Sequence, residues 1–244
     1  IKWYKKETMA IVTGFDHKIR IYYLNKNRRF VLLKVLNEHT NHAMGILIHE
    51  DTSKFYSVGW DPDIRIWNLN TLKLEGKIST GGKNCIGSAI VELEKNKIMA
   101  VGFFAGGIGL YNLQTKEEIG YYETGYSCNM NSAVYVESQG LFYSRISNSR
   151  LGIYAYDKNE MKLSLVKVIE NFATHPTIHE LPDQNEILIS DGKKHLYLLN
   201  TETQELTKSH ELDLVTAGGF AFDRKKRRLF VTNRIMSGIS IFQY

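Results

Sequence analysis

His175 and His179 lie four residues apart, and they are the side chains whose type and spacing come closest to a metal site. On a helix, two histidines at this spacing face the same way and can share a zinc ion. Pro176 directly follows His175, however, and proline disfavours a helix there. On a strand the pair would share a face, so a shared ligand stays open as the less favoured interpretation. The favoured one is a solvated loop histidine and a partly packed strand histidine, and we expect no metal.

Motifs for nucleophilic or phosphate chemistry are also missing from the sequence. It contains no Gly-x-Ser-x-Gly elbow, no phosphate-binding loop and no paired-carboxylate motif. The nearest glycine loop, Gly106-Gly107-Ile108-Gly109, falls at a predicted strand turn, where small residues are common. A catalytic site would instead need carboxylates or histidines that converge in one place, and apolar-rich runs such as GSAIVELE, SAVYVES and GGFAFDR offer mainly Ala, Val, Ile and Phe. We therefore predict that the protein is not an enzyme and has no cofactor.

One strand pattern recurs along the chain, and the fold that it forms must position any functional side chains. Its clearest copy is DIRIWNL at residues 63–69. The positions equivalent to Trp67 are Tyr22, Tyr111, Tyr154, Leu199 and Phe242. With Trp67 included, successive positions are 45, 44, 43, 45 and 43 residues apart. A strand repeat of about 40 to 45 residues is typical of β-propeller blades, whereas shorter helical repeats run at about 33 to 34.

Each period contains four apolar-rich runs separated by turn residues. In residues 43–79 they are AMGILIHE, KFYSVGW, DIRIWNL and LKLEGKIS. Runs rich in Val, Ile, Tyr, Phe and Trp and bounded by Asp, Asn, Gly or Pro predict antiparallel strands, with little helix elsewhere. We expect an all-β propeller of four-stranded antiparallel blades in one domain over 1–244, with six blades at about 1–36, 43–79, 87–124, 132–170, 176–212 and 218–244.

The two ends of the sequence suggest that more blades exist. The chain opens at Ile1 without an initiator Met, and it stops at Tyr244 directly after a third strand. A propeller closes its ring because open strand edges promote aggregation. We therefore expect this sequence to be part of a longer polypeptide, with a ring of seven blades as the favoured total.

The second blade resembles a WD40 repeat through His39, Ser57, Asp61 and Trp67. His39 and Asp61 are 22 residues apart, and Asp61 and Trp67 are six apart, as is typical of that family. The resemblance implies a propeller in which these four residues form a hydrogen-bonded set, since a buried carboxylate needs donors. Blade one keeps the acid at the position of Asp61, as Asp16, whereas blades three to six depart from the pattern there, with Ala105, Asn148, Lys193 and Met236. The dipeptide that gives the family its name is here Trp67-Asn68, and Glu38 stands where a Gly is expected.

Cys85 and Cys128 lie 43 residues apart, at equivalent places in the segments that lead into blades three and four. Adjacent blades would bring them to the same face, so a disulfide is conceivable. Two thiols in a chain of this size nevertheless suit a reducing compartment, and we expect them to be free.

Charge marks the only surface segments that stand out. Lys and Arg exceed Asp and Glu by 31 − 26 = 5, and the excess is concentrated in two predicted turns. One is a run between the first two strands of the last blade, and the other lies between the third and fourth strands of the first blade: Arg224, Lys225, Lys226, Arg227 and Arg228, and Lys26, Arg28 and Arg29. In a propeller both kinds of turn emerge on the same face, so a combined basic patch would attract an acidic partner.

These patterns favour a non-catalytic protein–protein interaction scaffold within a larger intracellular assembly. We expect it in the cytoplasm, with a cytoskeletal or ciliary assembly favoured because a basic face suits the acidic tails of tubulin. The alternative is a nucleic-acid or phosphoinositide binding module that uses the same face. Nucleic acid is less favoured because no aromatic residues are interleaved with the basic run for base stacking. No apolar run approaches the roughly 20 residues that a membrane span needs.

Overall fold

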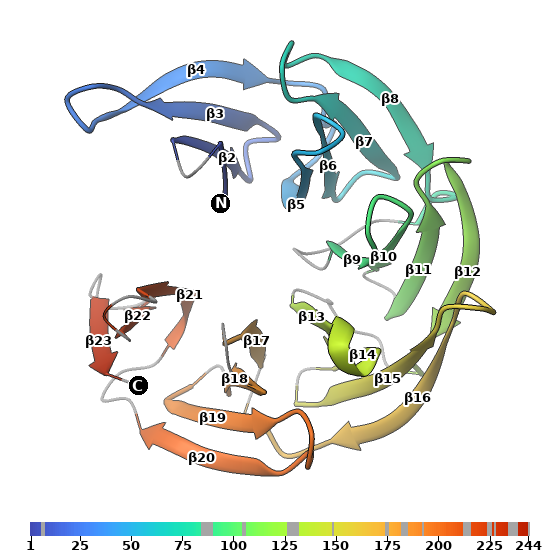
Figure 1. Cartoon of the computed structure of the whole chain (residues 1–244), viewed down its shortest axis with the longest axis vertical. Coiled ribbons are helices and arrows are strands. Elements are labelled where there is room, and N and C mark those ends of the chain that lie inside the picture. Colours follow the sequence, from blue (N-terminus) through green and yellow to red (C-terminus); the bar gives the residue numbers. More distant parts are fainter. Residues whose placement is uncertain are drawn as a thin grey trace. The chain divides into compact units, whose positions relative to one another are not determined.

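The structure is a computed structural model that describes residues 1–5, 8–83, 90–103, 106–125, 132–147, 149–173, 176–181, 185–191, 193–211, 216–223, 226, 228–233 and 239–243. Its strands form five four-stranded antiparallel sheets and one three-stranded sheet (Figure 1). The fold is therefore an all-β β-propeller with five four-stranded blades. The chain divides into two compact units, residues 1–131 with 157–163, and residues 132–156 with 164–244.

Within every sheet the strands follow one another in sequence order, each antiparallel to its neighbour. Blade one comprises β1 (Lys2–Tyr4), β2 (Met9–Thr13), β3 (Ile19–Leu24) and β4 (Phe30–Leu36). Blade two comprises β5 (Ala43–His49), β6 (Lys54–Gly59), β7 (Asp63–Asn68) and β8 (Leu74–Ser79). Blade three comprises β9 (Ile90–Glu94), β10 (Ile98–Gly102), β11 (Gly107–Asn112) and β12 (Glu117–Glu123).

Blade four comprises β13 (Ala133–Val136), β14 (Leu141–Arg145), β15 (Leu151–Asp157) and β16 (Lys162–Ile169). Blade five comprises β17 (Thr177–Glu180), β18 (Glu186–Ser190), β19 (His195–Asn200) and β20 (Leu206–Glu211). The three-stranded sheet comprises β21 (Thr216–Asp223), β22 (Arg228–Asn233) and β23 (Ile239–Gln243). In the described part of the chain the helical content is one 3-10 turn, Glu137–Gln139, and no helix there is long and apolar enough to cross a membrane.

The predicted repeat is confirmed by the strand register. Every residue aligned with Trp67 lies on the third strand of its sheet. In the five four-stranded blades these residues pair with the second strand at matching places: Tyr22 with Ala10, Trp67 with Phe55, Tyr111 with Met99, Tyr154 with Phe142, and Leu199 with Ile187. In the three-stranded sheet Phe242 pairs with Leu229. The sequence period is thus a period of hydrogen-bonded strand pairs.

The turn between the third and fourth strands also repeats. It opens on an Asn or Asp whose side-chain oxygen accepts two backbone N–H groups at 2.8 to 3.1 Å, namely Asn25, Asn68, Asn112, Asp157 and Asn200. Such side-chain bonds mimic a backbone turn. Each turn then passes through a non-glycine residue with φ between 52° and 62°, namely Arg28, Leu72, Lys116, Met161 and Gln204. Left-handed backbone is unfavourable for these residues, so the side-chain bonds offset part of that strain.

Blades one to three pack face to face. We call the face of a blade that packs on the next blade in the sequence its forward face, and the opposite one its backward face. The forward face of blade one, with Ile11, Ile19 and Ile21, packs on Phe55 and Trp67 of blade two. The forward face of blade two packs in the same way on blade three, with Val58, Ile64 and Ile66 against Phe103 and Tyr111. Burying each of these large side chains stabilises the fold by about 1.5 to 3 kcal/mol.

Candidate functional site

The four WD40-like residues of blade two are joined by hydrogen bonds. His39 lies in the segment between β4 and β5, Ser57 on β6, Asp61 in the β6–β7 turn and Trp67 on β7. Nδ1 of His39 lies 3.0 Å from both carboxylate oxygens of Asp61, and its Nε2 lies 2.7 Å from Oγ of Ser57. Nε1 of Trp67 donates to the same Oγ at 2.8 Å. All four residues are at most 4% exposed.

Arg65 adds a positive charge that the sequence comparison with WD40 repeats did not predict. Its Nη1 lies 2.6 Å from Oδ2 of Asp61, and the side chains of both residues are 1% exposed. Asp61 Oδ2 also accepts the backbone N–H of Thr40 at 2.9 Å. Burial alone would raise the pKa of Asp61, but the hydrogen bonds from His39 and Thr40 and the charge of Arg65 outweigh it and lower that pKa to about 2. Asp61 is therefore ionised at neutral pH.

His39 is neutral in this network. Burial lowers its pKa below the ordinary value of 6.5, and the neighbouring Asp61 only partly opposes that effect. We assign its proton to Nδ1, because that nitrogen faces a carboxylate, which can only accept. Nε2 then accepts from the hydroxyl of Ser57, whose oxygen accepts from Trp67. The guanidinium of Arg65, whose Nη1 lies 2.9 Å from Nδ1, donates to the carboxylate instead.

The order Asp–His–Ser has the connectivity of a hydrolytic triad, in which a histidine activates a serine oxygen. Here the serine is not available to a substrate. Ser57 is 0% exposed, and its oxygen already accepts the indole N–H of Trp67. The network therefore links the segment before β5 to the middle of the sheet, and its role is to stabilise that connection.

Blade one repeats the acidic and basic members of this set at the surface. Asp16 and Arg20 precede Tyr22 by six and two residues, as Asp61 and Arg65 precede Trp67. They also form an ion pair, but their side chains are 45% and 32% exposed. The hydrogen bond from Arg20 lowers the pKa of Asp16 to about 2. Val12 stands at the position of Ser57, so no hydroxyl continues the chain of bonds.

Blade five holds a buried carboxylate that does not lie six residues before the position aligned with Trp67, where Asp61 lies in blade two. Lys193 occupies the aligned position, whereas the acid is Asp191, two residues earlier and 1% exposed. Asp191 accepts the backbone N–H of Lys193 at 2.9 Å and that of His195 at 3.0 Å, and its Oδ2 lies 2.7 Å from Nδ1 of His195. The other aligned positions, Ala105, Asn148 and Met236, lie outside the described residues.

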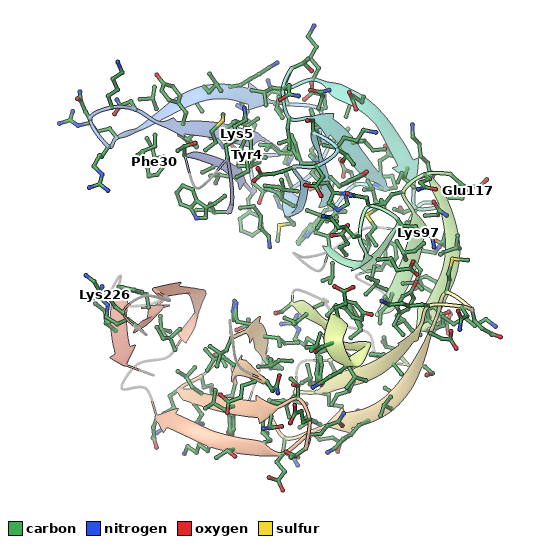
Figure 2. The ribbon with its side chains drawn as sticks, viewed as in Figure 1. Tyr4, Lys5, Phe30, Lys97, Glu117 and Lys226 are labelled. Atoms are coloured by element: carbon green, nitrogen blue, oxygen red, sulfur yellow. The ribbon has the colours of Figure 1, made fainter. Side chains whose placement is uncertain are left out.

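The basic residues of the β3–β4 turn, Lys26, Arg28 and Arg29, are all exposed. In the second basic segment, Lys226 is exposed between β21 and β22 (Figure 2), and Arg228 is half-buried at the start of β22 with its guanidinium 5.5 Å from the ring centre of Phe230. Arg224, Lys225 and Arg227 lie outside the described residues. The two basic segments belong to different compact units, so the predicted combined patch stays a prediction.

The glycines at 107 and 109 on β11 make room for aromatic rings. A Cβ atom at Gly107 would lie 2.0 Å from the hydroxyl oxygen of Tyr121, and one at Gly109 would lie 2.7 Å from ring atoms of Phe103 and Tyr111. This packing explains the glycines without a phosphate ligand. His179 lies on β17, while His175, Cys85 and Cys128 fall outside the described residues. Among the residues that are described, no three His, Cys, Asp or Glu side chains gather as metal ligands would.

The repeated sheets and turns define a β-propeller. When the sequence is compared with known proteins, no family model matches it, and no curated protein matches it either.

Proposed function

We propose that the protein is a non-catalytic scaffold of WD40 type that binds other proteins within a larger intracellular assembly. The hydrogen-bonded set in blade two has the residues and spacing of that family. We count the three-stranded sheet as a sixth blade and favour a ring of seven. The recurring Asn or Asp turns support a stiff scaffold, because each is held by two side-chain hydrogen bonds.

The proposal for the kind of partner rests on the basic β3–β4 turn. Lys26, Arg28 and Arg29 are exposed, and no acidic residue lies between Asp16 and Glu38. Asn25 holds the turn, accepting the N–H groups of Asn27 and Arg29 at 3.0 Å each. A fixed cluster of cations favours an acidic protein segment through long-range attraction. Acidic tails such as those of tubulin fit this chemistry, so we propose a cytoplasmic location in a cytoskeletal or ciliary assembly.

Affinity purification of the intact protein, followed by identification of the proteins that accompany it, tests this function. The variant Lys26→Glu/Arg28→Glu/Arg29→Glu should lose partners with acidic segments. The matched control, Lys158→Glu/Lys162→Glu, reverses charges around the equivalent turn of blade four, where Asp157 and Glu160 already balance them. The control should keep those partners. The same set of proteins with all three forms would contradict the proposal.

The alternative function is binding of nucleic acid or phosphoinositide by the same cations. It predicts binding of RNA or anionic vesicles that weakens steeply with salt, because phosphate contacts release counterions. If the triple variant loses RNA or vesicle binding while its accompanying proteins are unchanged, the alternative replaces the scaffold.

A further inference from the structure

A lysine ammonium group lies between aromatic rings and a carboxylate at the margin of blade three. Nζ of Lys83, in the segment that follows β8, lies 4.5 Å from the ring centre of Tyr121 and 5.7 Å from that of Phe103. The same nitrogen donates to both carboxylate oxygens of Glu118, at 3.0 and 2.9 Å. We call Phe103, Glu118 and Tyr121 the ammonium box. Lys83 and the box belong to one compact unit, residues 1–131 with 157–163.

Blade three supplies all three members of the ammonium box. Phe103 directly follows β10, and Glu118 and Tyr121 lie on β12. Oε2 of Glu118 also accepts the hydroxyl of Tyr111 at 2.7 Å, which holds the carboxylate in place. The ring centres of Phe103 and Tyr121 are 5.8 Å apart. Ring faces and a carboxylate each attract a cation, so their combination on one blade is a preorganised cation site.

The geometry of the box fits a primary alkylammonium group. Such a group is a compact charge with three N–H donors, and Glu118 accepts from it through both oxygens. A trimethylated ammonium has no N–H and would lose these hydrogen bonds. The box therefore favours the end of an unmodified lysine side chain, and the chain places its own Lys83 there.

The turn that delivers Lys83 contains two adjacent glycines. The turn is closed at its base by Thr80, whose Oγ1 lies 2.6 Å from the carbonyl oxygen of Lys83. Gly81 and Gly82 have φ values of 64° and 80°, and a Cβ atom at Gly82 would meet no atom within 4 Å. Glycine rotates where other residues are hindered, and the side chain of Lys83 is still 33% exposed. Lys83 can therefore turn out into water without displacing a packed side chain at Gly82.

We propose that the ammonium box binds a lysine side chain of a partner protein, and that Lys83 occupies the box when no partner is bound. The exchange replaces one ammonium group by another. Glu118 thus keeps a counter-charge, and the ammonium group of Lys83 regains its water. This site goes beyond the scaffold function proposed above, because it takes a basic group, whereas the β3–β4 turn takes an acidic segment.

Binding of a capped lysine, Nα-acetyl-lysine methylamide, to the purified intact protein tests this inference. Ligand-observed NMR measures its dissociation constant for the parent protein and for Lys83→Ala, which empties the box. We expect about tenfold tighter binding to Lys83→Ala, because the box of the parent is open for only part of the time. The matched control Lys77→Ala removes a lysine that pairs with Asp63 at 3.0 Å, and it should bind the probe as the parent does. Equal dissociation constants for Lys83→Ala and the parent would overturn the inference.

Two further measurements separate the box from a general apolar surface. The double variant Lys83→Ala/Glu118→Gln keeps both rings but removes the carboxylate, and it should lose the binding. Nα-acetyl-norleucine methylamide, which has an uncharged side chain of similar length, should not bind to Lys83→Ala. Binding that persists in the double variant, or equal binding of the norleucine probe, would overturn the inference.

The parent protein keeps the inference testable if Lys83→Ala does not fold. Its weaker binding of the capped lysine should then be abolished by Glu118→Gln alone, and binding that survives this change would overturn the inference. Since purified protein is used, this test can fail while the scaffold function stands. The affinity purification above can likewise fail while the capped lysine still binds.

Discussion

Blades one and two carry the same acidic and basic residues at the same spacing, yet the two pairs have different roles. In blade two the side chains of Asp61 and Arg65 are 1% exposed and bonded to His39, whereas those of Asp16 and Arg20 in blade one are 45% and 32% exposed. Water screens the exposed pair, and surface ion pairs of this kind contribute little. The spacing of the two residues along the sequence therefore does not determine how much the ion pair stabilises its blade. In blade two that is determined by the segment between β4 and β5, which carries His39 and covers the pair.

The largest expected effect comes from removing the buried acid. Asp61→Ala leaves the guanidinium of Arg65 buried without its counter-charge, which we expect to lower the free energy of unfolding by about 3 to 5 kcal/mol. Urea unfolding at neutral pH measures it, and Asp16→Ala, the control, should leave stability unchanged within error. The Asp61 variant, where folded, should retain binding to acidic partners at the β3–β4 turn. Equal losses for the two variants would show that burial does not distinguish the pairs.

A smaller loss is expected when the serine is removed. Ser57→Ala leaves Nε2 of His39 and Nε1 of Trp67 without their partner, and unpaired buried groups cost about 1 to 3 kcal/mol. The control Ser164→Ala removes an exposed hydroxyl on β16. If both serine variants unfold at the same urea concentration as the parent protein, the hydroxyl does not link the two rings.

The two buried titrating groups of blade two predict lower stability in acid. The pKa of His39 is lowered in the folded state, so as pH falls below 6.5 His39 binds a proton in the unfolded chain before it does so in the folded chain. The free energy of unfolding therefore decreases as pH falls towards the folded pKa. Asp61 adds a second loss as pH drops from its ordinary value of 3.8 to about 2. Urea unfolding of the parent protein from pH 7 to pH 3 should show this decline, and a free energy of unfolding that stays constant over that range would contradict it.

The sequence predicted the repeat, the third strands and the four WD40-like residues, because apolar alternation and side-chain type follow strand geometry directly. It did not predict Arg65 as a partner of Asp61, since an arginine on a strand is usually solvated and its burial depends on the segment that folds over it. Asp191 was missed because blade five places its acid two residues before the aligned position.

The smallest effect should be equal in the two blades. Asn25 and Asn68 each accept two backbone N–H groups, at 3.0 Å in blade one and 2.8 Å in blade two, and each turn continues through a left-handed residue, Arg28 or Leu72. Replacing either Asn by Ala removes both bonds in a solvated turn, and in blade two it also removes the exposed bond from Nδ2 of Asn68 to Oε1 of Glu75 at 2.7 Å. Because exposed bonds of this kind add little, we expect each variant to lose about 1 kcal/mol. Thermal or urea unfolding of the single variants should give matching losses, and the double variant should give their sum because the turns share no partner. A much larger loss for Asn68→Ala would mean that the turn of blade two is coupled to Trp67 beside it, so the buried network would extend to the outer end of β7.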